Sequence, residues 1–147
     1  MSSSRFVSAA RSRGGHFGSV FFTNAGADAN ENAIRMARLV TGRDKVLSTY
    51  RSYHGNTGAA IVSTGDWRRQ PNEYATGHAH FFGPFLYRSE FWATTPEEES
   101  ARALHHLRRV IESEGPATIA ALLLETVPGT AGVLVPPPGY LEGVRAL

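Results

Sequence analysis

The chain has 147 residues, of which 41% are hydrophobic and 19% charged, a composition typical of a globular protein rather than a disordered one. Its net charge of +2 comes from fourteen arginines and one lysine against thirteen acids. The arginines are scattered and form no basic stripe with interleaved aromatics, which argues against a nucleic-acid partner. The absence of cysteine excludes disulfides, thiolate metal sites and a cysteine nucleophile.

No apolar run approaches the ~20 residues of a membrane span, so we expect no membrane partner. The first five residues carry positive charge but no apolar core follows them, so a secretory signal is not expected and cytoplasm is the default location. Residues 1–16 are rich in Ser, Arg and Gly and predict a poorly ordered arm, with an organelle transit peptide as the alternative. Residues 17–147 are expected to form one unit.

The first regular elements are a short strand and a helix. The apolar residues 20–22 (VFF) predict a buried strand, and residues 30–40 predict a helix that ends at Gly42 as its C-cap. A strand, a tight turn and a helix N-terminus together favour anion binding, and Gly26 would let a phosphate approach the backbone. An ordinary turn between strand and helix is the alternative. The predicted apolar face of the helix consists of Ala29, Ala33, Met36/Ala37 and Val40.

A second strand is predicted over residues 45–49, followed by a polar and aromatic loop over 50–55 and a short helix over 56–64. Residues 65–92 are expected to be irregular. Within them, His78 and His80 could form a metal pair on one strand face, although no third ligand is evident nearby. The aromatic residues 81–88 would pack near a substrate entrance or a subunit interface, or form a surface loop.

Thr95 begins the clearest helix, because Thr95 can cap it, Pro96 suits its first turn and Glu98 completes a capping box. Gly115 and the proline after it predict its end. The predicted buried stripe consists of Ala101, Leu104, Val110 and Ile111.

Residues 118–124 are apolar throughout, which predicts a central strand covered on both faces. Glu125 follows at the carboxyl end of this strand, where ligands bind in open parallel sheets. Residues 136–138 predict a stiff extended piece, and a helix begins at Tyr140. Alternation of strands and helices therefore predicts an α/β fold with a mostly parallel sheet flanked by helices.

Four segments, in order and with compatible spacing, resemble class III aminotransferases, which are pyridoxal-phosphate (PLP) enzymes of fold type I. They are residues 24–38 (NAGADANENAIRMAR), 52–55 (SYHG), 125–129 (ETVPG) and 136–140 (PPPGY). The resemblance implies part of an aminotransferase large domain over residues 17–147. It also implies transfer of an amino group from an amine or amino acid to a keto acid by a homodimer.

The resemblance also implies which residues bind PLP. Gly26 and Ala27 would contact the phosphate, Tyr53 would stack on the pyridine ring, His54 beside it would belong to the same site, and Glu125 would lie next to the cofactor. One departure is Thr130, which stands where family members often have a second acid that pairs with a substrate-handling arginine.

The resemblance further implies that the Schiff-base lysine and the aspartate that pairs with the pyridine nitrogen would come after Leu147. We therefore expect a fragment without catalytic residues, which transfers no amino group alone. The single lysine, Lys45, is expected at the amino end of its strand, roughly 16 Å from the cofactor end. The alternatives are a non-catalytic remnant or interaction piece, and a nucleotide-binding α/β domain, although a G-x-G-x-x-G motif is absent.

Overall fold

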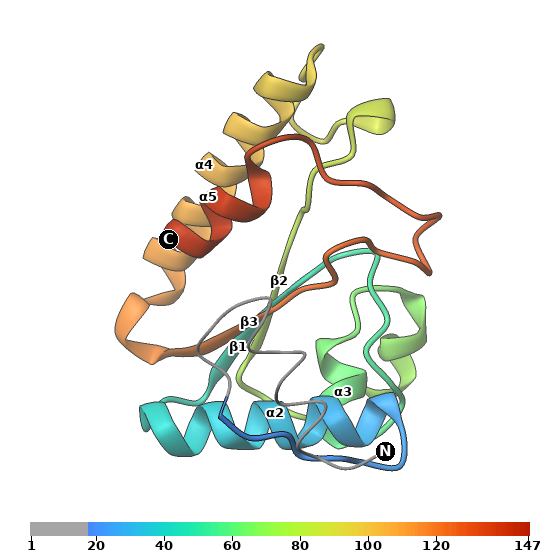
Figure 1. Ribbon diagram of the computed structural model, residues 1–147, viewed down its shortest axis with the longest axis vertical. Helices are drawn as coiled ribbons and strands as arrows, with labels where there is room; N and C mark the ends of the chain where they lie inside the picture. The colour runs from blue at the N-terminus through green and yellow to red at the C-terminus, as the bar shows by residue number, and fades with distance from the viewer. Residues whose placement is uncertain (1–17) are drawn as a thin grey trace.

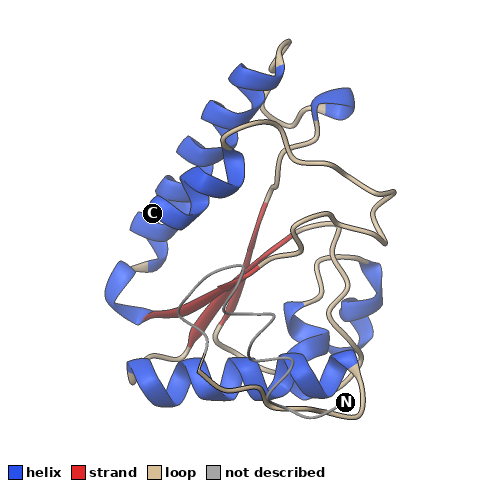
Figure 2. Cartoon of the chain, viewed as in Figure 1, coloured by secondary structure: helices blue, strands red, loops and turns tan. Residues whose placement is uncertain are grey.

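The computed structural model describes residues 18–147, so the predicted arm over 1–16 lies outside the described residues. The sheet has three parallel strands in the order β2-β1-β3. Helices α2 and α3 lie on one side of it, and α4 and α5 on the other (Figures 1 and 2). The elements are α2 (Gly26–Thr41), β1 (Lys45–Thr49), α3 (Gly58–Ser63), β2 (His78–Phe81), α4 (Pro96–Glu114), β3 (Ile119–Leu123) and α5 (Tyr140–Ala146), with 3₁₀ turns at Trp67–Asn72, Leu86–Arg88 and Pro116–Thr118. This confirms the predicted α/β fold.

Strand β1 is the centre of the sheet and has the range that the sequence predicted. Val46 and Leu47 are fully buried, as expected for a strand with a neighbour on each edge and helices over both faces. The main core cluster contains Leu47, Phe81 of β2 and Leu107 of α4. Strand β3, predicted to be central, instead lies at one edge of the described sheet and its side chains are only partly buried. Its apolar sequence indicated burial but could not indicate strand order.

Helix α2 begins at Gly26, four residues before the predicted start, and ends as predicted at Gly42, whose φ is 66° and whose N–H donates to the Arg38 carbonyl. The predicted apolar face is wrong, because Ile34 is buried while Met36 and Val40 are 50% and 86% exposed. Polar side chains on the Ile34 side of the helix make hydrogen bonds to neighbouring segments, and these bonds decide which side faces inward.

The predicted strand over residues 20–22 is also wrong. This stretch does not join the sheet, and Phe21 and Phe22 are 68% and 57% exposed. An apolar run indicates a strand only if another strand is available to pair with it, and sequence alone does not supply that information. Within residues 18–147, no helix is long and apolar enough to cross a membrane.

Helix α4 starts and ends where predicted, and the Glu98 N–H donates to the Thr95 hydroxyl at 3.2 Å. The Glu98 carboxylate also accepts from the Thr94 N–H at 2.9 Å and the Thr94 hydroxyl at 3.0 Å, so its contacts extend one residue beyond Thr95. Val110 and Ile111 pack on the core as predicted, but Ala101 is exposed. The buried positions of the first turns are instead Glu99, Ser100, Ala103 and Leu107.

Residues 65–92 were expected to be irregular, but the strand considered at His78 and His80 is present as β2 and extends to Phe81. His78 Nδ1 lies 2.9 Å from the Ser63 hydroxyl oxygen, and Arg38 donates to its Nε2 at 3.3 Å. Burial, followed by the Arg38 charge, lowers the pKa of His78 to about 4. His80 stacks on Tyr50. Over residues 18–147, no group of three His, Cys, Asp or Glu side chains could hold a metal ion, so the histidine pair has no third ligand there.

Glu99 is fully buried and connects α4 to the aromatic loop that follows β2. Its carboxylate accepts from the Phe85 N–H at 2.6 Å and from the Ser89 hydroxyl. The Ser89 oxygen in turn accepts from the N–H groups of Phe91 and Ala93. A buried carboxylate thus organises a loop that has little regular structure of its own.

We predict that Glu99→Ala lowers the free energy of unfolding by about 2–4 kcal/mol, because two buried donors lose their acceptor. Glu97→Ala is the matched control, since Glu97 lies in the same first turn but is exposed. Denaturant unfolding of both variants measures the difference. Equal effects would contradict the role of Glu99.

A second prediction concerns pH. Because the pKa of folded His78 is about 4, against an ordinary value of 6.5, the unfolded chain takes up this proton first as the pH falls. The stabilisation from neutral His78 is therefore fully present above pH 6.5 and is lost as the pH falls toward 4. His78→Gln should flatten the dependence of unfolding free energy on pH in this window. His105→Gln, at an exposed position of α4, should leave the slope as it is, and a parental slope in His78→Gln would refute the assignment.

Candidate functional site

Three segments that are far apart in sequence meet near the carboxyl ends of the strands: the N-terminus of α2, the loop after β1 and Glu125 after β3. Gly55 of the loop packs so closely on α2 that a Cβ added to it would lie 2.6 Å from the Ala27 Cβ. Asn30 of α2 donates to the His54 carbonyl at 2.7 Å. The Glu125 carboxylate is near enough to affect the pKa of His54. The tertiary structure thus places all five predicted site residues in these neighbouring segments.

The N-terminus of α2 is open. The residue before the helix, Ala25, is extended and supplies no side-chain cap, and the first amides of any helix lack partners within it. Among residues 18–147, no atom of another segment lies within 4 Å of where a Cβ on Gly26 would be. Unsatisfied amides beside free space suit an anion, which the helix dipole also attracts, although Asp28 brings one negative charge into the same turn.

The loop after β1 is held to Thr64 and Gly65. The Ser52 hydroxyl donates to the Thr49 carbonyl at 2.7 Å and accepts from the Gly65 N–H at 3.1 Å. The His54 N–H donates to the Thr64 hydroxyl at 3.0 Å. Gly55 has a φ of 125°, a conformation that favours glycine. The backbone that presents Tyr53 is therefore fixed on both sides of that residue.

Tyr53 is half-buried, and Arg68 lies over its ring with the guanidinium carbon 4.0 Å from the centroid. Arg68 is itself held by an ion pair with Asp66. The cation attracts the electron-rich face of the ring and so fixes its plane. One face of Tyr53 is thereby covered by protein.

His54 is buried and Glu125 is half-buried, and each has a buried polar atom without a partner among the described residues. His54 is 5% exposed, and its Nε2 has no hydrogen-bond partner among the described residues. Burial lowers the pKa of His54, and the Glu125 charge opposes that change. One Glu125 oxygen accepts from the Gly129 N–H at 3.1 Å, while Oε1 is buried and has no partner within residues 18–147. Orphaned buried atoms of this kind are rare in folded proteins and mark places where a polar ligand fits.

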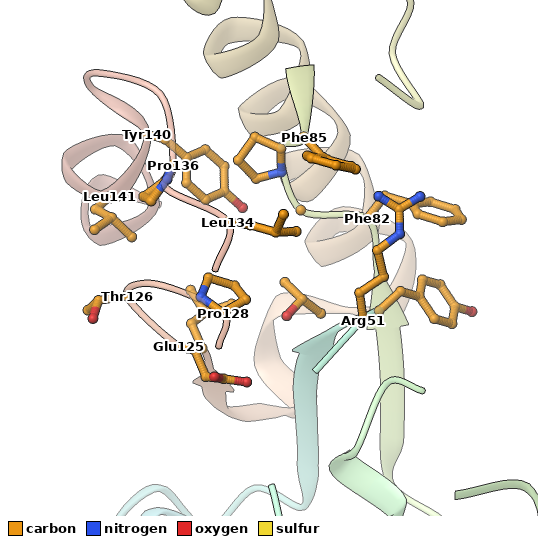
Figure 3. A pocket seen from close by; sticks show the side chains of 15 residues that line it. Arg51, Phe82, Phe85, Glu125, Thr126, Pro128, Leu134, Pro136, Tyr140 and Leu141 are labelled. Atoms are coloured by element: carbon orange, nitrogen blue, oxygen red, sulfur yellow. The ribbon is translucent and has the colours of Figure 1, made fainter. Parts of the chain in front are cut away.

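A separate cavity of about 40 Å³ lies at the carboxyl ends of the three strands. Figure 3 shows Glu125, Leu134 and Tyr140 on one side of it and Phe82 and Phe85 on the other. Burial raises the pKa of Tyr140 to about 12, and its hydroxyl has no partner in the described part of the chain. The cavity has room for only a few water molecules. Of the five predicted site residues it includes Glu125 alone, so it is not the predicted cofactor site.

Sequence reasoning assigned no role to Asn30, Glu31, Thr64 or Arg68, which hold the site segments in place. Each of these residues has its partner 10 to 29 residues away in the sequence, and no local sequence pattern reveals such pairs. The expected position of Lys45 is confirmed. It opens β1 at the amino end, and its Nζ contacts the Glu114 carbonyl and carboxylate, each at 2.7 Å.

Residues 7–147 match the family Aminotransferase class-III. The chain is 35% identical over 134 residues to the uncharacterized aminotransferase YhxA of Bacillus subtilis, covering 86% of this chain and 29% of that protein. It is 34% identical over 128 residues to an acetylornithine aminotransferase of Methanothermobacter thermautotrophicus, covering 87% of this chain and 28% of the relative. The chain thus spans under a third of the length of these relatives.

Solved structures give the same result. A taurine:2-oxoglutarate aminotransferase of Bifidobacterium kashiwanohense, in complex with PLP and glutamate, superimposes with a TM-score of 0.88 at 45% identity, covering 98% of this chain and 34% of that one. A PLP-bound amine transaminase of an uncultivated Pseudomonas species gives a TM-score of 0.90 at 30% identity, with the same coverage. Sequence and structure agree that this chain belongs to the class III aminotransferase family.

Proposed function

We propose that the chain carries part of the cofactor site of a PLP-dependent transaminase, which moves an amino group from an amine or amino acid to a keto acid. The supporting observation is that an uncapped helix N-terminus, a fixed aromatic residue and a half-buried carboxylate meet near the carboxyl edge of a parallel sheet. Residues 17–147 would form part of the large domain of that enzyme.

Gly26 and Ala27 would hold the phosphate through their amides, because Ala25 makes no side-chain cap on α2 and no other segment of residues 18–147 fills the space beside Gly26. Tyr53 would offer the ring face that Arg68 does not cover to the pyridine ring. The orphaned atoms of His54 and Glu125 would bond to polar groups of the cofactor or its surroundings. PLP when bound supplies an electron sink, while the protein supplies binding, orientation and electrostatics.

For the whole protein we propose a homodimer, as the family resemblance implies, and a cytoplasmic location as the default. We propose only the chemical class of the amino donor, an amine or amino acid. Relatives of similar identity have names as different as acetylornithine aminotransferase and taurine–pyruvate aminotransferase.

Gly26→Val tests the phosphate contact. Within the described part of the chain, the added Cβ meets no atom of another segment within 4 Å, so the fold should persist while the approach of a phosphate is blocked. PLP affinity, followed by titration of the cofactor absorbance, should fall roughly 10- to 100-fold, as for lost charge-assisted hydrogen bonds. Ala29→Val adds the same branched side chain to an exposed position of α2 and should bind PLP like the parent. Unchanged affinity in Gly26→Val would remove this segment from the site.

Lys45 should take no part in cofactor chemistry, because it is paired with Glu114 at the opposite end of β1 from Glu125 and Tyr53. After incubation with PLP and borohydride, peptide mapping should find no stoichiometric label on Lys45. Lys45→Arg, which retains the charge, should keep the parental PLP affinity within about twofold, since distant sites without shared partners rarely couple by more than about 0.5 kcal/mol. Saturable labelling of Lys45 together with amino transfer would show that this placement is wrong.

A further inference from the structure

Two adjacent polar residues of α2 reach out of the helix to the segment that follows Tyr53. Asn30 donates from Nδ2 to the His54 carbonyl at 2.7 Å. Glu31 accepts through Oε1 from the Thr57 hydroxyl at 2.8 Å and from the Ala60 N–H at 3.0 Å. Both residues lie about one turn after Gly26 and Ala27 on the same helix, so one rigid element carries the candidate phosphate amides and the contacts to the loop.

Glu31 also completes helix α3. Thr57, the residue before α3, makes no side-chain cap. Instead, the carboxylate of Glu31 in α2 accepts a hydrogen bond from the N–H of Ala60 in α3. A carboxylate at this end of a helix is favoured by the unsatisfied amides there. The close approach of Gly55 to Ala27 gives a further point of contact between α2 and the loop. Residues 54–60 are thus held against α2 at several successive points.

We propose that Asn30 and Glu31 are positioning residues, which fix the separation between the α2 amides and the ring of Tyr53 before a ligand arrives. The inference rests on the proposed function, in which these two points hold the phosphate and the ring of PLP. The phosphate and the pyridine ring are joined by a short arm, so a protein with correctly spaced contacts orders fewer groups on binding. Neither side chain has to touch the cofactor for this role.

The test compares a ligand that uses both points with one that uses a single point. Isotope-labelled parent, Asn30→Ala and Glu31→Ala chains are titrated with PLP and, separately, with inorganic phosphate, while NMR follows the amide signals of Gly26 and Ala27. In both variants PLP affinity should fall about three- to tenfold, which corresponds to one net hydrogen bond. Affinity for inorganic phosphate should stay at the parental value, because that ion needs no fixed spacing.

Two control variants separate positioning from a general effect on the helix. Asn32→Ala removes the same amide group, which donates to the Asp28 carbonyl within α2 at 2.8 Å, and should bind PLP like the parent. Glu31→Gln keeps an acceptor oxygen for Thr57 and Ala60 and should restore most of the affinity that Glu31→Ala loses. If Asn30→Ala does not give a folded spectrum, Glu31→Ala and Glu31→Gln allow the same comparison of PLP affinity with phosphate affinity.

The outcomes distinguish this inference from the function on which it rests. If PLP shifts no Gly26 or Ala27 signal in the parent, the proposed function fails and the positioning role fails with it. If the parent binds PLP but the variants bind it equally well, or lose inorganic phosphate by the same factor as PLP, only the positioning role is overturned.

Discussion

The structure depends on the burial of β1. Its neighbours β2 and β3 pair with it in parallel, and helices cover both faces, so Val46 and Leu47 are completely removed from water. Parallel pairing requires each connection to cross from one end of the sheet to the other, which places helices on the faces and loops at the carboxyl ends. The loop with Tyr53 and the segment with Glu125 therefore emerge at the same edge, side by side.

Buried or half-buried acids and amides hold the irregular parts of the chain. Glu99 fixes the aromatic loop after β2, whereas Glu31 and Asn30 fix the segment after β1. Each uses side-chain acceptors or donors to satisfy backbone groups that no helix or strand satisfies. Loops of this kind are ordered because a buried polar group without its partner would cost about 1–3 kcal/mol.

The candidate site combines satisfied and unsatisfied groups. The backbone around Tyr53 is fully held, while the start of α2, His54 Nε2 and Glu125 Oε1 keep free capacity for hydrogen bonds among the described residues. Fixed surroundings with a few unsatisfied polar atoms are typical of a binding site, because the ligand supplies the missing partners without reorganising the protein.

The sequence by itself determined the elements with local signals. Gly42 ends α2 and Thr95 begins α4 as predicted, because a helix cap depends on residues within one turn. Strand β1 and the placement of Glu125 after an apolar strand also follow from local pattern. The family resemblance indicated which residues belong to the candidate cofactor site. The tertiary structure alone decided strand order, the extent and pairing of β2, the failure of residues 20–22 to join the sheet and the inward face of α2. The physical reason is that these features depend on partners distant in sequence. Strand β2 forms by pairing with β1, and the inward side of α2 is the one that carries Asn30 and Glu31, which bond to residues 54–60.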